Sequence, residues 1–146
     1  MCGIIGIVSK QPLKNQSWLG NGRDTMIHRG PDSAGEWWSN DGKVGFGHRR
    51  LSILERSPLG HQPMQDISKD LCVVFNGEIY NFEDLRKELL SKGHQFRSHS
   101  DTEVILEAYK EWGNDCLSHL NGMFAFALYD ERKKSLLIAR DRAGEK

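Results

Sequence analysis

The 146-residue sequence has few cysteines, no net charge and no long hydrophobic run. Its three cysteines, Cys2, Cys72 and Cys116, include no Cys-x-x-Cys pair, which disfavours both a disulfide framework and a zinc site. Lys and Arg total 20 and so do Asp and Glu, so the basic excess of a nucleic-acid-binding or membrane-surface protein is missing. No apolar run reaches the roughly 18 residues of a membrane helix, and residues 4–8 are too short for a signal-peptide core. We therefore expect a soluble, cytoplasmic chain of about one domain, with no nucleic-acid or membrane partner.

Short runs of β-branched and apolar residues predict the strands. One run covers residues 3–8, a second covers residues 71–75, and residues 123–139 form a hairpin with a charged turn. The runs at 71–75 and 123–139 hardly alternate, so these strands are expected to be covered on both faces. Asp41-Gly42 predicts a further hairpin, closed by a type I′ turn.

Three segments carry helix signals. The first spans about residues 16–27. The second begins at Asn81, a good N-cap residue. The third follows Ser100-Asp101-Thr102-Glu103, which has the pattern of a capping box. Strands, then helices, then strands predict a layered α+β domain.

Cys2 is the first candidate for chemistry. If Met1 is removed, one residue carries both a thiol and the free α-amine, whose reference pKa of about 7.7–8.0 suits a base near neutrality. Such a residue is a nucleophile with a built-in general base. While Met1 is attached, the Cys2 nitrogen is an amide without basicity, and we expect such a chain to be inactive. Taken alone, a cysteine at this position is more often incidental.

Further motifs accompany Cys2 along the whole chain. The motifs, in order, are Cys2-Gly3-Ile4-Ile5-Gly6, His28-Arg29-Gly30-Pro31-Asp32-Ser33, Gly47-His48-Arg49-Arg50-Leu51-Ser52-Ile53, Asn76-Gly77-Glu78-Ile79-Tyr80-Asn81, Ser100-Asp101-Thr102-Glu103, Gly122–Asp130 and Ala139-Arg140-Asp141-Arg142. Taken together, these motifs resemble those of the class II glutamine amidotransferases, which are N-terminal-nucleophile hydrolases. The last two motifs narrow the resemblance to the asparagine-synthetase branch.

The resemblance implies a role for each motif residue in hydrolysing the side-chain amide of L-glutamine. Cys2 is the nucleophile and forms a thioester. The Asn76 side chain and the Gly77 N–H form the oxyanion hole, although Asn-Gly by itself reads as a turn. Neither a metal nor a cofactor is expected for this reaction.

The resemblance also implies how glutamine is held. Arg50 binds the α-carboxylate, for which a guanidinium is well shaped. Asp101, helped by Glu78, binds the α-ammonium, and Leu51, Ser52 and Ile53 complete the substrate-binding segment.

The remaining histidines and cysteines are expected to be structural. His28, together with Arg29 and Asp32, is interpreted as a support of the site. A Cys2–His48 dyad ranks below a structural role for His48. Cys72 and Cys116 are expected to be small buried hydrophobes, and the remaining histidines, His61, His94, His99 and His119, to lie at the surface.

The fold implied by the resemblance is a four-layer αββα sandwich spanning residues 1–146. The chain stops after a strong strand at Lys146, so we expect it to be truncated, to be less stable than a complete glutaminase domain and to self-associate as a homo-oligomer. A following synthetase domain, absent here, is expected to use ATP, Mg²⁺ and aspartate to make asparagine. Two alternatives stay open: a relative that amidates another acceptor, such as a sugar or an antibiotic precursor, and a module that binds an amino acid without hydrolysing it.

Overall fold

A computed structural model describes residues 2–52 and 57–146, so Met1 and Ile53 lie outside the described residues. The first half contains β1 (Gly3–Val8), α1 (Ser17–Asp24), β2 (Ser33–Trp38) and β3 (Val44–Arg50). The three strands form an antiparallel sheet in the order β1-β3-β2. We call this the first sheet.

The second half forms a second sheet and its helices. Its strands are β4 (Met64–Gln65), β5 (Leu71–Ile79), β6 (Gly122–Asp130) and β7 (Ser135–Arg140), antiparallel in the order β4-β5-β6-β7. Its α-helices are α2 (Phe82–Ser91), α3 (Asp101–Trp112) and α4 (Cys116–His119), and two short 3₁₀ turns cover Pro58–Gly60 and Gly113–Asp115.

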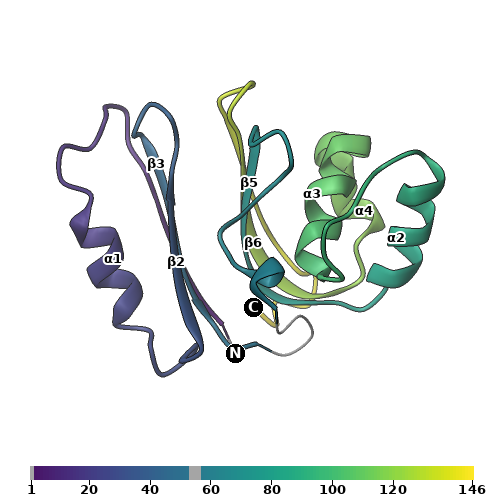
Figure 1. Cartoon of the computed structure of the whole chain (residues 1–146), viewed down its shortest axis with the longest axis horizontal. Coiled ribbons are helices and arrows are strands. Elements are labelled where there is room, and N and C mark those ends of the chain that lie inside the picture. The colour runs from purple at the N-terminus through teal and green to yellow at the C-terminus, as the bar shows by residue number, and fades with distance from the viewer. Residues whose placement is uncertain (1, 53–56) are drawn as a thin grey trace.

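The two sheets pack face to face between helices (Figure 1). Helix α1 covers the outer face of the first sheet, and α2, α3 and α4 cover the outer face of the second. This confirms the predicted four-layer αββα sandwich. Among the described residues, no helix is long and apolar enough to cross a membrane.

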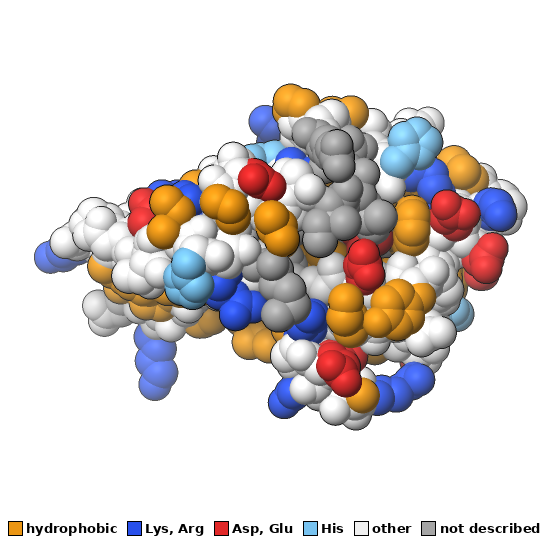
Figure 2. All heavy atoms as spheres, turned by 90° about the horizontal axis from the view of Figure 1, so that it is seen from below, with side chains coloured by type: hydrophobic (Ala, Val, Ile, Leu, Met, Phe, Trp, Pro, Cys, Tyr) orange, Lys and Arg blue, Asp and Glu red, His pale blue; other side chains and the backbone are white. Residues whose placement is uncertain are grey.

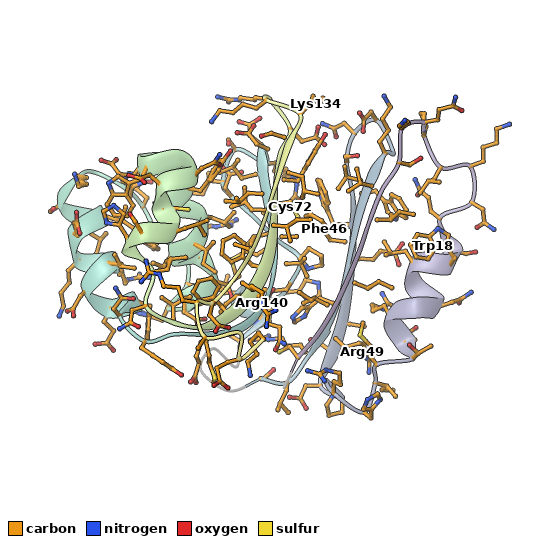
Figure 3. All side chains as sticks on the ribbon, turned by 180° about the vertical axis from the view of Figure 1, so that it is seen from behind. Trp18, Phe46, Arg49, Cys72, Lys134 and Arg140 are labelled. Carbon is orange, nitrogen blue, oxygen red and sulfur yellow. The ribbon has the colours of Figure 1, made fainter. Side chains whose placement is uncertain are left out.

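Side-chain alternation along β3 and β5 separates two cores. Cys72 and Val74 point to the first sheet, where they pack with Val44, Phe46 and Tyr129 (Figure 3). Val73 and Phe75, which alternate with Cys72 and Val74 along β5, point to the helices and join the larger core. That core also includes Val104, Leu106 and Phe126. The interior between the sheets is therefore lined by the even-numbered residues of β3 and β5.

Several local predictions are wrong in detail. The β2–β3 connection is not a type I′ turn, because Gly42 has a positive φ but Asp41 does not. The Ser39 hydroxyl accepts the Val44 N–H at 2.9 Å and the Lys43 N–H at 3.2 Å, which stabilises a longer connection instead.

The helix caps also differ from expectation. Ser100 caps α3 by accepting the Thr102 N–H at 3.1 Å, but the Glu103 carboxylate accepts from Arg97 and Ser98 rather than closing a capping box. Asn81 precedes α2 as predicted, yet its side chain binds the turn after α4, donating to the His119 carbonyl at 2.9 Å.

Strand β7 is covered less than its apolar sequence predicts. It is the edge strand of the second sheet, and Ile138 is 71% exposed. The continuous apolar run therefore does not indicate a strand covered on both faces in this case.

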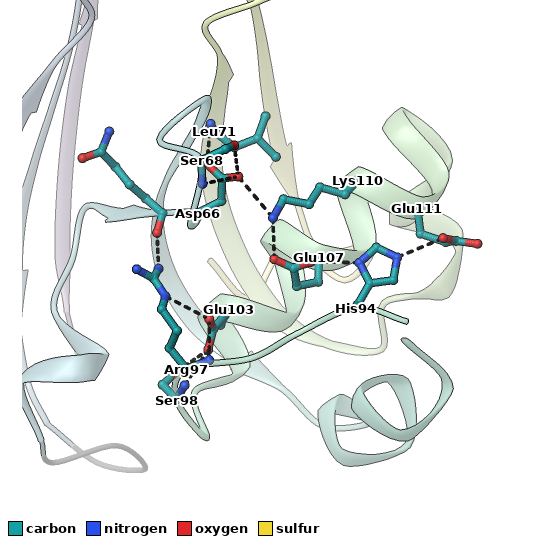
Figure 4. Close-up of polar contacts among 11 residues, drawn as sticks. Asp66, Ser68, Leu71, His94, Arg97, Ser98, Glu103, Glu107, Lys110 and Glu111 are labelled. Carbon is teal, nitrogen blue, oxygen red and sulfur yellow. Dashed lines mark hydrogen bonds and ion pairs between the residues drawn. The ribbon is translucent and has the colours of Figure 1, made fainter. Parts of the chain in front are cut away.

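A chain of charged side chains attaches α3 to the loops around it (Figure 4). Lys110 bridges Glu107 at 2.7 Å and Asp66 at 3.1 Å, and His94 lies between Glu107 at 2.8 Å and Glu111 at 2.9 Å. His94 is therefore a partly buried network residue, which corrects its prediction as a surface histidine. His119 is partly buried as well and stacks on Trp112 with ring centroids 3.8 Å apart.

Candidate active site

A cavity of about 250 Å³ opens between the two sheets near the start of the chain. Its walls include seven residues singled out from the sequence, which come from the residue before β1, from β3, β5 and α3, and from the segment after β3. These residues are Cys2, Arg50, Leu51, Asn76, Gly77, Glu78 and Asp101. Figure 2 shows the end of the sandwich that carries both termini, where side chains of both charges are scattered among hydrophobic ones.

Strand pairing explains why these residues meet. Gly3 pairs with Arg49 in the β1–β3 register, so continuing the register places Cys2 beside Arg50. Arg50 continues the row formed by Val44, Phe46 and His48, whose side chains face the second sheet. On β5, Asn76 and Glu78 continue the row of Cys72 and Val74, which faces the first sheet. The apolar core between the sheets therefore ends in a polar pocket.

The Cys2 thiol lies against the segment that follows β3. Its Sγ accepts the Leu51 N–H at 3.4 Å and lies 3.7 Å from the Leu51 carbonyl oxygen. Arg29 donates from Nε to the Cys2 carbonyl at 3.1 Å. These contacts hold the backbone on both sides of the thiol.

The two neighbouring arginines of β3 point in opposite directions. Arg49 donates from Nε to the Gly30 carbonyl at 3.0 Å and approaches Asp24 at the end of α1 at 3.5 Å, outside the cavity (Figure 3). Arg50 lines the cavity, is 9% exposed and donates to the Ser57 carbonyl at 3.2 Å. The alternation thus separates an arginine that faces away from the cavity from one that lines it.

Asn76 and Gly77 lie within β5 and not after it, which corrects their predicted position. Gly77 pairs with Phe124 of β6, and a Cβ at Gly77 would come within 2.1 Å of the Met123 carbonyl oxygen. Only glycine permits this close approach of the two backbones. The interpretation of Asn76-Gly77 as a turn is therefore excluded.

The backbone of β5 has an open edge at the cavity. The backbone N–H of Tyr80 donates to the Asn121 carbonyl on the β6 side. Because the N–H and C=O groups of successive strand residues point alternately to the two neighbouring strands, those of Phe75, Gly77 and Ile79 point away from β6. They lie on the side of the short β4 and beyond its end. The Ile79 N–H there is accepted by Asp101 at 3.1 Å. The Gly77 N–H thus points to the open edge of the strand, where Gly77 lines the cavity.

Asp101 is a buried acid in the first turn of α3. It is 6% exposed, and this burial raises the pKa of Asp101 to about 6. The charge of Glu78 also raises this pKa, whereas the hydrogen bonds from the N–H groups of Ile79 and Thr102 lower it. A carboxylate that is costly to ionise because it is buried is well suited to a cationic ligand, which would stabilise its charge.

Two of the predicted supports, Arg29 and Asp32, hold backbone segments that form the pocket. Asp32 accepts the Ser52 N–H at 2.7 Å, and its own N–H donates to the Arg50 carbonyl at 3.0 Å, while Arg29 holds Cys2. His28 is exposed. Ser52 does not line the cavity, and Ile53 lies outside the described residues.

The sequence did not single out several wall residues. Gln62 accepts the Phe75 N–H at 2.7 Å and donates to the Thr102 hydroxyl at 3.3 Å. The other wall residues outside the predicted set are Gly60, Phe75, Ser100, Thr102, Met123 and Lys146. The capping pattern pointed to Ser100 and Thr102, but only as helix residues. Within residues 2–52 and 57–146, no group of three or more His, Cys, Asp or Glu side chains could hold a metal ion.

Comparison with known structures defines the class of fold. The chain aligns with the glutamine phosphoribosylpyrophosphate amidotransferase of Bacillus subtilis with a TM-score of 0.78 at 22% identity, covering 99% of this chain and 38% of the other. The chain therefore has the fold of the matching part of that enzyme.

Sequence comparison identifies the family. Residues 1–146 match the family described as the glutamine amidotransferase domain, and the chain belongs to it. It is 47% identical over 150 residues to asparagine synthetase [glutamine-hydrolyzing] 3 of Bacillus subtilis (strain 168), and 40% identical over 157 residues to the amidase chry2 of Gibberella zeae. All of this chain is covered in both comparisons, yet it spans only 24% and 23% of those relatives.

Proposed function

We propose that the domain hydrolyses the side-chain amide of glutamine to glutamate and ammonia, with Cys2 as nucleophile. The observation that carries this proposal is that Cys2, Arg50, Asn76, Gly77 and Asp101 line one cavity. A nucleophile, a cation, an anion and two amide donors are the groups that glutamine hydrolysis needs.

The first half of the proposed reaction forms a thioester. After removal of Met1, the Cys2 α-amine takes the thiol proton and the sulfur attacks the side-chain carbonyl carbon of glutamine. The resulting oxyanion accepts hydrogen bonds from the Asn76 amide and the Gly77 N–H. The α-ammonium then protonates the leaving nitrogen, the carbon–nitrogen bond breaks, and ammonia departs.

The second half returns the free thiol. The α-amine, neutral again, takes a proton from water as the water oxygen attacks the thioester carbonyl. The same two donors hold the second oxyanion, and collapse breaks the carbon–sulfur bond. The thiolate regains its proton from the α-ammonium, and glutamate leaves.

Substrate recognition uses the charged walls. Arg50 binds the α-carboxylate of glutamine, and Asp101 with Glu78 binds its α-ammonium. Leu51 and Ser52, with Ile53 outside the described residues, complete the segment expected to contact the substrate. Because Leu51 also donates to the Cys2 sulfur, substrate binding and nucleophile position are coupled through this segment.

We further propose that the ammonia serves asparagine synthesis in a longer protein, with aspartate and ATP as the other substrates and Mg²⁺ as cofactor of a synthetase domain. The asparagine synthetase of Bacillus subtilis, 47% identical to this chain, supports the proposal. The three free thiols, Cys2, Cys72 and Cys116, agree with a cytoplasmic location.

A second candidate differs only in the acceptor of the ammonia. The Gibberella zeae relative at 40% identity is named as an amidase, so a close likeness of this domain does not restrict the acceptor to aspartate. The full-length protein, supplied with ATP, Mg²⁺, glutamine and either aspartate or another carboxylate acceptor, distinguishes the two candidates by the amide that accumulates.

The test of hydrolysis itself is glutamate release by protein whose intact mass shows loss of Met1. We expect catalytic turnover of glutamine. A module that only binds amino acids would give a glutamine-dependent rise in melting temperature without glutamate, and that result would overturn the proposed function.

A further inference from the structure

The nucleophile and the oxyanion hole belong to different sheets. Cys2 precedes β1 of the first sheet, whereas Asn76 and Gly77 belong to β5 of the second. Backbone hydrogen bonds fix positions within each sheet, but contacts across the interior must fix one sheet against the other. Catalysis at such a site is sensitive to displacements of about 1 Å, which can cost about 10²-fold in rate.

His48 makes a polar contact between the sheets at this level. It lies in β3 between Phe46 of the apolar core and Arg50 of the cavity, pairs with Ile4 and Gly35, and is 0% exposed. Its Nε2 lies 3.2 Å from the carbonyl oxygen of Phe75 in β5. Because a carbonyl oxygen only accepts, Nε2 carries the proton and donates it.

Phe75 immediately precedes the proposed oxyanion hole and lies beyond the end of the neighbouring strand β4. Strand β4 pairs with β5 at Cys72 and Val73, and no backbone group within residues 2–52 and 57–146 pairs with the N–H or C=O of Phe75 on that edge. The Gln62 side chain accepts the N–H at 2.7 Å, and His48 donates to the C=O. Two side chains thus replace a strand at the residue before Asn76.

We propose that His48 is a positioning residue for glutamine hydrolysis, whose Nε2–H bond to the Phe75 carbonyl sets Asn76 and Gly77 at the height of Cys2. This inference rests on the proposed function. It assigns to His48 a role in kcat, because the geometry of the oxyanion hole matters most in the transition state.

A role for His48 as the base is less consistent with its surroundings. Its Nε2 is already committed to Phe75, and its Nδ1 has no hydrogen-bond partner among the described residues. Burial lowers the pKa of His48 to about 4, against the bond to Phe75 that raises it, with small lowering by His61 and Arg50. The ring is therefore neutral at pH 7.

Two substitutions separate the hydrogen bond from the shape of the ring. In His48→Gln, the side-chain amide nitrogen can reach the position of Nε2 and donate to Phe75. In His48→Phe, the ring remains but the donor is lost. We expect kcat for glutamine to fall about 10- to 100-fold in His48→Phe and less than about fivefold in His48→Gln, with KM within about twofold of wild type in both. If His48→Phe does not fold, His48→Asn replaces it, because its shorter amide ends near the position of Nδ1 and cannot reach Phe75.

The matched control is a second hydrogen bond between the two halves, at the opposite end of the sandwich. There the Asn40 N–H of the β2–β3 connection donates to Glu131 at 2.6 Å, and Glu131 is 8% exposed. Glu131→Ala should lower the melting temperature and leave kcat unchanged. This control measures what loss of stability alone does to the assay.

The outcomes are read from kcat, the pH profile and the Gly77 amide resonance together. The proposal is supported if kcat falls in His48→Phe (or His48→Asn) and is largely retained in His48→Gln. The amide resonance of Gly77 should also shift in the variant without the donor, and Glu131→Ala should not produce that shift. A lowered melting temperature with unchanged kcat would overturn the proposal. Equal losses of kcat in His48→Gln and His48→Phe, together with removal of a titration from the pH profile, would also overturn it. If wild type releases no glutamate, the proposed function fails separately, and the Gly77 resonance of the His48 variants still decides whether His48 holds this strand.

Discussion

The Leu51 N–H donates to the Cys2 sulfur at 3.4 Å, which joins the nucleophile to the segment directly after Arg50. The bond follows from the register of β1 and β3, in which Gly3 lies opposite Arg49. A ligand whose carboxylate is held by Arg50 therefore lies beside the thiol. This relationship gives the substrate-binding predictions their direction.

Arg50→Lys should raise the KM for glutamine roughly 10- to 100-fold with a smaller change in kcat. A guanidinium can hold a carboxylate with two parallel hydrogen bonds, and an ammonium cannot reproduce that fork. Steady-state kinetics across a wide glutamine range measure the effect. Arg49→Lys is the control, because Arg49 binds Gly30 and Asp24 outside the cavity. A normal KM in Arg50→Lys would contradict the role proposed for Arg50.

Asp101→Asn should raise KM by a similar factor at pH 7.5 and also change the pH profile. With the pKa of Asp101 raised to about 6 by burial, the carboxylate needed for the substrate ammonium is lost as the pH falls through 6. The logarithm of kcat/KM in wild type should then fall with a slope of two below pH 6, one proton each for Asp101 and the Cys2 α-amine. The variant should fall with a slope of one, and an unchanged slope of two would rule out Asp101 as the titrating group.

His94 should make the stability of the domain depend on pH. Burial lowers the pKa of His94, but the carboxylates of Glu111 and Glu107 together outweigh it, so the pKa is raised above the usual 6.5. The folded state thus binds the proton more tightly than the unfolded state. The stabilisation is complete below about pH 6.5 and is lost as the pH rises through the folded pKa.

Urea unfolding of His94→Gln tests this dependence. The variant should be destabilised more at pH 6 than at pH 8.5, because the stabilising proton is bound only at the lower pH. His28→Gln, at an exposed position, should show the same small effect at both values. An equal loss at both pH values in His94→Gln would mean that its protonation does not stabilise the fold.

Strand β7 should mediate association of the isolated domain at high concentration. It lies at the edge of the second sheet with Ile138 71% exposed, and an unpaired apolar edge pairs with other chains. Light scattering should show self-association that Ile138→Lys reduces. Leu90→Lys, which removes an exposed apolar side chain from α2, should not reduce it. A strictly monomeric wild type would refute this prediction.

Sequence patterns located the elements with local signals. The strand at Gly3–Val8 follows from a β-branched run and has the expected bounds, and the helix after Ser100 begins where the capping serine predicts. These features depend on neighbouring residues, which is why a single sequence reveals them. The choice of Arg50 over Arg49 came from the resemblance, and the alternation of side chains along β3 explains why Arg50 is the one that lines the cavity.

The rest depends on contacts between distant segments. Nothing near Phe75 in the sequence indicates that Gln62 and His48 take over its backbone groups, and the partnership of Glu103 with Ser98 overrides a regular capping box. The open edge of β5 likewise exists only because β4 is two residues long. The resemblance therefore assigned Gly77 to the site, but the apolar run ending at Phe75 predicted a position directly after the strand instead of within it.

The assignment of Cys2 and its α-amine is tested by measuring intact mass and glutamate release on the same preparations. Wild type without Met1, wild type retaining Met1, Cys2→Ala and Cys116→Ala form the set. Cys116 is the control thiol, since burial raises its pKa to about 11 and it lies in α4 outside the cavity. We predict activity only where Met1 is absent and Cys2 is present, with Cys2→Ala below about 1% of wild type and the Met1-retaining protein lower by about 10²–10⁴-fold. Full activity in protein whose mass still includes Met1, or in Cys2→Ala, would contradict catalysis by the N-terminal cysteine.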